Sequence, residues 1–311
     1  MENQKGRFFG IFWILFNLGS LISGFLPFFS PELKYITIWF LCLMAFGLCL
    51  SYFLVSPARV IRENGSRVTS KTGFNISHEL HQIPRTLLKK NILFLVPIFF
   101  YTNFYYSYRL GHFTHELFTD RTVTFNTICY WASQMLGAFT FGQYLDNPLC
   151  VRSKKAQLGL VFIGFFFTIT WVGCLLMELK YSAVVSLRVD ILDDSYSASL
   201  VLILLSGFSD ATIQSWCYWM MGTTTNNVMI LSRHAGFYKA IQSAGTAVAW
   251  YASLLGISSI TWVVVVWVLL YVALGFAYFA TRGVTNTNCH LGMTRHFNDS
   301  PENTLYNSQL T

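Results

Sequence analysis

The chain has 311 residues, of which 54% are hydrophobic and only 11% are charged, and its formal net charge is +7. A charged fraction so far below the ~25% of soluble domains argues against a soluble globular protein. The positive charge does not require a nucleic-acid partner, because the Lys and Arg residues gather in the connections between apolar segments.

Eight apolar segments are long enough to cross about 30 Å of hydrocarbon as helices. In chain order they are 8–28, 35–55, 91–108, 123–145, 157–177, 199–221, 234–256 and 259–281. We therefore predict an all-α, polytopic integral membrane protein that resides in a lipid bilayer.

A long polar interval divides these spans into two groups. Residues 57–90 are rich in Gly, Ser, Thr, Asn and basic side chains, which is typical of a linker between bundles. We expect residues 1–56 to hold two helices of a first bundle and residues 91–282 to form a second bundle of six. Residues 283–311 lack apolar periodicity and are predicted to be a disordered tail.

The distribution of basic residues predicts the orientation, because positively charged connections stay on the cytoplasmic side. If Met1 is inside, the outer connections hold only Lys34, Arg109, Arg121, Lys180 and Arg188. All but one of the remaining Lys and Arg residues then lie in inner segments. Both termini are therefore predicted to be cytoplasmic, and the linker 57–90 with them.

Ionisable side chains occur within two of the last spans. Asp210 lies about halfway along 199–221, where a carboxylate costs roughly 2.5 to 3.5 kcal/mol on insertion scales and needs a cavity, a partner or a proton. Gln214 lies one turn further on the same face. In the next span, AGFYKAIQSAGTAVAW (235–250), Lys239 and Gln242 share a face. Asp210 and Lys239 differ in depth, which favours a relay through Gln214 over a direct pair.

Polar side chains on two earlier spans are further candidates for lining the same cavity. Asn103 and Tyr106 share one face of 91–108, and Asn126 and Gln134 share one face of 123–145. The candidate cavity residues are Asn103, Asn126, Gln134, Asp210, Gln214, Lys239 and Gln242. The alternative is structural: amides would serve as interhelical hydrogen bonds of about 0.6 kcal/mol each, and Lys239 would extend to the headgroups.

Enzyme and nucleic-acid classes find little support. The sequence contains no P-loop, no dinucleotide fingerprint and no nucleophile elbow, and no basic patch with aromatic residues outside the spans. His112, His115 and Glu116 in an outer connection have metal-ligand chemistry, but we expect them to be solvated. We predict no enzyme activity and no cofactor.

Five sequence blocks resemble a single family. They are KGRFFGIFWILFNLGSLISG (5–24), YTNFYYSY (101–108), TFNTICYWASQMLGAFTFGQYLD (124–146), SDATIQSWCYWMMG (209–222) and AGFYKAIQSAGTAVAW (235–250). The family they resemble is the uncoordinated-93-like branch of the major facilitator superfamily. Its members have twelve spans in two six-helix bundles, and the first block resembles the start of the fifth. The resemblance thus implies a member that lacks the first four helices.

The same resemblance implies a gating motif and two classes of function. Gly142 and Asp146, followed by Arg152, resemble a short inner-loop motif that holds neighbouring helix ends together. The family implies a secondary transporter that moves a small solute or ion by alternating access. The alternative is a non-transporting accessory subunit of an ion channel or a trafficking partner.

Overall fold

The computed structural model describes residues 5–29, 33–54, 59, 61, 84, 87–181 and 188–286. Most of the predicted linker 57–90 and most of the tail 283–311 lie outside these residues. The all-α prediction is confirmed for the described part of the chain, which contains long helices and a parallel bridge between Phe118 and Val189 but no named strand. The helices in chain order are α1 Lys5–Phe29, α2 Leu33–Ser51, α4 Lys90–Leu93, α5 Val96–Phe104, the π-helix η3 Ser107–Phe113, α6 Thr114–Leu117, α7 Asp120–Asp146, α8 Arg152–Tyr181, α9 Tyr196–Thr224, α10 Val228–Ser253 and α11 Ser259–Thr281.

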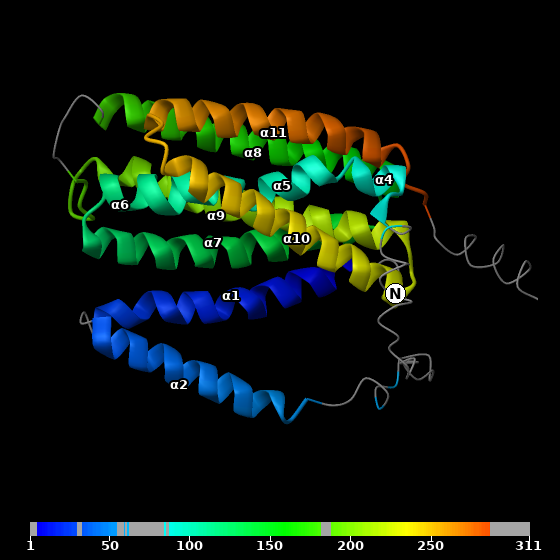
Figure 1. The fold of residues 1–311 in the computed structure, drawn as a ribbon, viewed down its shortest axis with the longest axis horizontal. Helices are drawn as coiled ribbons and strands as arrows, with labels where there is room; N and C mark the ends of the chain where they lie inside the picture. The colour runs from blue at the N-terminus through cyan, green and yellow to red at the C-terminus, as the bar shows by residue number, and fades with distance from the viewer. Residues whose placement is uncertain are drawn as a thin grey trace, which may run out of the picture.

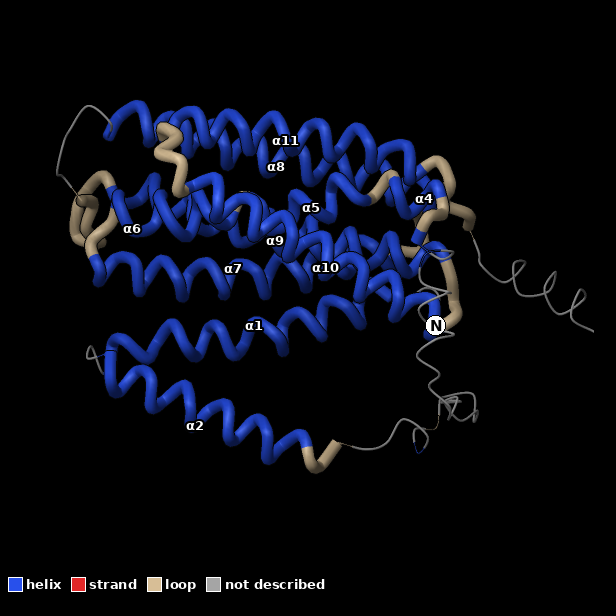
Figure 2. Tube along the Cα trace, viewed as in Figure 1, coloured by secondary structure: helices blue, strands red, loops and turns tan. Residues whose placement is uncertain are grey.

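The long helices run side by side along the longest axis of the molecule (Figure 1). Successive long helices alternate in direction, so the N-terminal end of α1 and the last residues of α11 lie at the same end (Figure 2). Five helices, α1, α2, α8, α9 and α11, are long and apolar enough to cross a membrane. This arrangement is that of a polytopic membrane protein.

The helices α7 and α10, with 27 and 26 residues, are as long as these helices. They are less apolar because they carry buried polar side chains such as Gln134 and Gln242. Helix α7 packs between α1 and α9, and α10 packs against α5. Their polar faces therefore meet other helices within the bundle.

The segment expected as one span over 91–108 consists of several helical pieces between Lys90 and Leu117. Pro97 has no N–H to donate to the carbonyl oxygen of Leu93, so α4 ends there and α5 begins anew. Further on, the N–H of Thr114 donates to the carbonyl oxygen of Arg109, five residues back. Such π-type insertions occur mostly where side chains must be re-aimed for function.

Candidate functional site

A single carboxylate lies at the centre of the largest polar cluster. Asp210 on α9 is completely buried. Five side chains donate hydrogen bonds to it: Tyr105 at 2.5 Å, Tyr106, Tyr130 at 2.6 Å, Gln134, and Gln214 at 3.0 Å. A carboxylate offers about four lone-pair sites, so the donors use its full accepting capacity. None of the described Lys and Arg side chains forms an ion pair with Asp210.

The break in the third span places two of these donors. Tyr105 is the C-cap of α5, and Tyr106 is the N-cap of the π-helix that follows. Neighbouring residues on a helix diverge by about 100°, yet the two hydroxyls reach opposite oxygens of Asp210. The carboxylate is thereby held between α5, η3, α7 and α9.

The cluster extends to α1 through Gln134. The side-chain oxygen of Gln134 accepts hydrogen bonds from the Trp13 indole at 3.2 Å and from the Asn17 amide at 3.0 Å. Gln134 and Asn17 are both fully buried. A shift of α1 against α7 would therefore change the polar surroundings of Asp210 directly.

The cluster also extends to α10, through two glutamines in series. The side-chain oxygen of Gln214 accepts from the Gln242 amide at 3.2 Å and from the Tyr238 hydroxyl at 3.2 Å. The side-chain oxygen of Gln242 accepts from the Lys239 ammonium at 2.8 Å. The connection thus runs from Asp210 to Lys239 through Gln214 and Gln242, one amide more than the expected relay.

The ammonium group of Lys239 is held mainly by aromatic rings. It lies 5.3 Å from the ring centroid of Tyr238, 5.7 Å from that of Trp13 and 5.8 Å from that of Tyr218. These distances fall within the range of cation–π attraction. The positive charge is therefore held between α1, α9 and α10, although much of the Lys239 side chain is exposed.

The structure connects all but one of the candidate cavity residues. The Gln242 amide nitrogen lies 3.0 Å from the Asn103 side-chain oxygen, which joins the third span to the network. Asn126 does not belong to this network. Its side-chain oxygen accepts a hydrogen bond from the Tyr196 hydroxyl at 2.6 Å, and the residue lies about 12 Å from Gln134 along α7.

Sequence reasoning missed two features of this cluster. Of the three tyrosine hydroxyls only that of Tyr106 was expected at the cavity, although the density of tyrosines in YTNFYYSY was also a signal for Tyr105. Arg109, which we expected in a connection between spans, instead lies in η3 and is only 5% exposed. Its guanidinium carbon lies 3.8 Å from the ring centroid of Tyr130, itself a donor to Asp210. The Nε and Nη1 atoms of Arg109 have no hydrogen-bond partner among the described residues.

The residues of the predicted gating motif lie where α7 meets the start of α1. The carboxylate of Asp146 accepts hydrogen bonds from the backbone N–H groups of Gly6 at 2.7 Å and Arg7 at 2.6 Å. It therefore caps the positive end of α1. The approach is close enough that a Cβ added at Gly142 would lie 2.7 Å from the Gly6 carbonyl oxygen.

Basic side chains hold other helix ends at the same end of the bundle. The ammonium group of Lys5 donates to carbonyl oxygens at the C-terminal end of α9, including that of Gly222. Lys155 donates to the carbonyl oxygens of Leu145 at 2.8 Å and Asn147 at 3.1 Å. The guanidinium of Arg152 reaches the carbonyl oxygen of Asn286 at 3.5 Å. Cations at helix C-termini complement the helix dipole, so these contacts stabilise this end of the bundle.

Of the residues His112, His115 and Glu116, which we expected to be solvated, His115 and Glu116 are exposed, whereas His112 is half-buried and paired with carboxylates. His112 Nδ1 lies 2.9 Å from Glu116 and its Nε2 lies 3.4 Å from Glu178. The hydrogen bond to Glu178, the largest effect, raises the pKa of His112 above its usual value. No group of three His, Cys, Asp or Glu side chains among the described residues is arranged to hold a metal ion.

Two cavities lie at opposite ends of the bundle. One of about 550 Å³ lies at the end where α1 begins, and one of about 220 Å³ is lined by His112, Glu116 and Trp250. Asp210 lines neither, because the donors around it fill the space. The carboxylate is thus enclosed in this structure.

A model of the family described as "Ion channel regulatory protein UNC-93" matches residues 7–279. UNC93-like proteins 1 and 2 of Arabidopsis thaliana are each 32% identical to this chain over 285 residues, which are 87% of this chain and 62% of each relative. An UNC93-like protein of Schizosaccharomyces pombe is 30% identical over 282 residues, 86% of this chain and 56% of that protein. No solved structure matches significantly. The chain thus spans less than two thirds of the length of these relatives.

Proposed function

This chain belongs to the UNC-93 family, and on that premise we propose that it takes part in moving a small solute or ion across a membrane. In this proposal it has the two-bundle organisation of the major facilitator type and works by alternating access. Asp210 is the group that takes up and releases a proton or a cation.

The observation that carries this proposal is the hydrogen-bonded carboxylate of Asp210. A carboxylate inside a membrane bundle is costly to retain, and such groups mark ion and proton pathways. The donors come from α5, η3, α7 and α9, and the network continues to α1 and α10. A change in the protonation of Asp210 would therefore alter hydrogen bonds that join α1, α5, α7, α9 and α10.

The alternating helix directions favour eight crossings (Figure 1). In this proposal α7, α10 and the broken segment 91–108 also cross the bilayer. The end that carries Lys5, Lys89 and Lys155 then faces the cytoplasm, which satisfies the positive-inside rule. The proposal makes both termini cytoplasmic.

The contacts of Gly142, Asp146 and Arg152 support a gating role. They hold helix ends together at the end we assign to the cytoplasm. Opening toward that side would separate α1 from α7 and break the two hydrogen bonds to Asp146. Asp146 then acts as a latch whose release accompanies the transport cycle.

The test is ion flux into vesicles. The full chain is reconstituted in proteoliposomes loaded with a pH-sensitive dye, and a membrane potential drives protons or, in a parallel assay, rubidium ions. We expect flux above that of empty vesicles, lost in Asp210→Asn and retained in Asp194→Asn, which makes the same change on an exposed outer residue. Flux that Asp210→Asn leaves unchanged would overturn the assignment.

Regulation of an ion channel is the second candidate function. The matching family model is described as a channel regulatory protein. In addition, α2 leaves its apolar side chains uncovered along its whole length, with Trp39 52% and Met44 70% exposed. In this reading α2 docks against a partner within the membrane and the polar network is structural. Co-purification of a channel that depends on α2, with no flux from the chain alone, would favour this function.

A further inference from the structure

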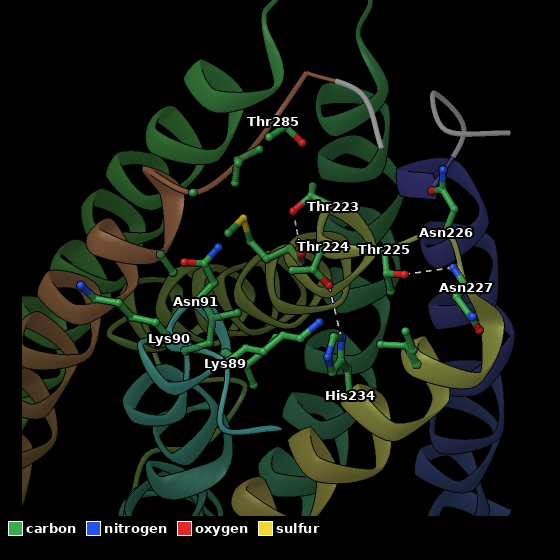
Figure 3. Close-up of a pocket in the computed structure, with 17 residues that line it drawn as sticks. Lys89, Lys90, Asn91, Thr223, Thr224, Thr225, Asn226, Asn227, His234 and Thr285 are labelled. Carbon is green, nitrogen blue, oxygen red and sulfur yellow. Dashed lines mark hydrogen bonds between the residues drawn. The ribbon is translucent and has the colours of Figure 1, made fainter. Parts of the chain in front are cut away.

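The cavity of about 550 Å³ lies where α4, α9, α10 and α11 meet. Its volume falls within the range of small-molecule sites. Figure 3 shows its polar lining, which comes from the residue before α4, the C-terminal end of α9 and the first turns of α10. It lies about 12 Å along α10 from Gln242, and so apart from the Asp210 network.

The charge of the lining is of one sign. Lys89 and Lys90 line the cavity, and none of the described residues that line it is acidic. Figure 3 shows the ammonium end of Lys89 directed toward His234 and Thr224, whereas Lys90 extends away from them. Lys90 instead lies with its ammonium 5.8 Å from the ring centroid of Phe94. Lys89 is therefore the cation available to a ligand.

A buried imidazole on α10 provides a second, independent feature. His234 is 2% exposed and lines the cavity. The Thr224 hydroxyl donates to the Met221 carbonyl oxygen at 2.7 Å, so at its 3.3 Å contact with His234 Nδ1 it must accept. The ring proton therefore lies on Nδ1. The Nε2 atom is buried and has no hydrogen-bond partner among the described residues.

Amide and hydroxyl groups complete the lining. Asn91 and Thr223 face the same space from α4 and α9, as Figure 3 shows. Such groups donate or accept hydrogen bonds according to the ligand. A buried nitrogen without a partner costs free energy until a ligand or water satisfies it, so the site is incomplete when empty.

We infer that this cavity binds a phosphate-bearing anion. A phosphate group offers several acceptor oxygens to Lys89 and Asn91, and in its monoprotonated form a hydroxyl that can donate to His234 Nε2. The first turn of α10 adds a positive helix end, which favours an anion. The same group occurs in two sources, an anionic lipid headgroup and a free phosphate compound.

The experiment measures binding to the full chain in nanodiscs. In one arm, inorganic phosphate is titrated into the chain in pure phosphatidylcholine discs, and the shift in melting temperature is recorded. In the other, the discs contain equal parts phosphatidylcholine and phosphatidic acid, and the retained lipid is identified by native mass spectrometry. Binding in the first arm assigns a free phosphate compound, and retention only of phosphatidic acid assigns the lipid.

Three variants make the test specific. Lys89→Gln removes the inward cation, and His234→Asn keeps an N–H for Thr224 while it deletes Nε2. Each is expected to weaken binding roughly tenfold, the effect of one charge-assisted or buried hydrogen bond. Lys154→Gln is the control, since Lys154 is an exposed lysine at the start of α8 that does not line the cavity.

Two results would overturn the inference. One is the absence of binding in both arms. The other is an equal loss in Lys154→Gln and Lys89→Gln, which would mean that surface charge alone attracts the anion. If His234→Asn does not fold, the exposed Lys89→Gln still decides the question. Neither result bears on the proposed role of Asp210, which the flux assay tests separately.

Discussion

Substitution of Gly142 by alanine tests whether close backbone contact holds α1 against α7. A Cβ at this position would lie 2.7 Å from the Gly6 carbonyl oxygen, and ordinary contacts begin at 3.4 Å. Because the obstacle is backbone, α1 has to move away by about 0.7 Å. The hydrogen bonds from Gly6 and Arg7 to Asp146, now 2.7 and 2.6 Å, would then stretch toward 3.3 Å and weaken.

The expected loss of stability follows from three contributions. Overpacking costs about 1 to 3 kcal/mol. Weakening two charge-assisted hydrogen bonds to a partly exposed carboxylate adds about 1 to 2 kcal/mol. Alanine is favoured over glycine within a helix by about 1 kcal/mol, which offsets part of this. We expect Gly142→Ala to lower the free energy of unfolding by about 2 to 3 kcal/mol.

The matched control is Gly19→Ala, in the middle of α1, where an added Cβ meets nothing within 4 Å among the described residues. It should stabilise the chain by up to about 1 kcal/mol through helix propensity alone. Unfolding is followed in mixed micelles with increasing SDS, and hydrogen exchange reports the Gly6 and Arg7 amides. If Gly142→Ala equals Gly19→Ala in stability and both amides stay protected, the proposed contact is refuted.

Three further outcomes follow from buried and paired charges. Arg109→Met should leave the free energy of unfolding within about 1 kcal/mol of wild type. The variant loses a cation–π contact with Tyr130 of about 2 kcal/mol, but it also removes two buried nitrogen atoms that have no hydrogen-bond acceptor, and the two effects offset each other. A loss above 3 kcal/mol in the same unfolding assay would contradict this. Asp210→Asn should lower the free energy of unfolding by about 2 to 4 kcal/mol, because a carboxamide has only one oxygen and cannot accept hydrogen bonds from the donors on both sides. Unchanged stability in the same assay would contradict this. The hydrogen bond to Glu178 raises the pKa of His112 in the folded protein. The melting temperature of His112→Gln should therefore fall furthest below that of wild type at pH values under about 6.5, and the difference should vanish as the pH rises through the pKa of the folded state. A difference that stays constant with pH would argue against the pairing.

The long helices and the family could be read from the sequence with little help from the structure. The helices α7, α8, α9 and α11 begin and end within a few residues of the predicted segments, because long apolar runs are a local property of the chain. The resemblance to the uncoordinated-93-like family is confirmed by the family model and the curated relatives. The third span was harder, because helical periodicity does not reveal where Pro97 and a π-turn interrupt a run.

The polar cluster shows where sequence reasoning reaches its limit. Helical spacing put Gln214 on the same face as Asp210, and the two are hydrogen-bonded. The same reasoning could not insert Gln242 between Gln214 and Lys239, nor separate Asn126 from the rest. Contacts between helices depend on the rotation and depth of each helix, and these are set by packing across the whole bundle.

By itself, the sequence determined that this is a multi-pass helical membrane protein of the UNC-93 family with a carboxylate among its apolar residues, because composition, run length and motif spacing are properties of the chain. Only the tertiary structure decided which side chains face that carboxylate, that Arg109 is buried, and that Asp146 caps α1. Tyr105 and Tyr106 lie 105 and 104 residues before Asp210, and Gly6 lies 140 residues before Asp146. Their meeting depends on how helices pack and on a one-residue change of helical winding, which no local pattern records.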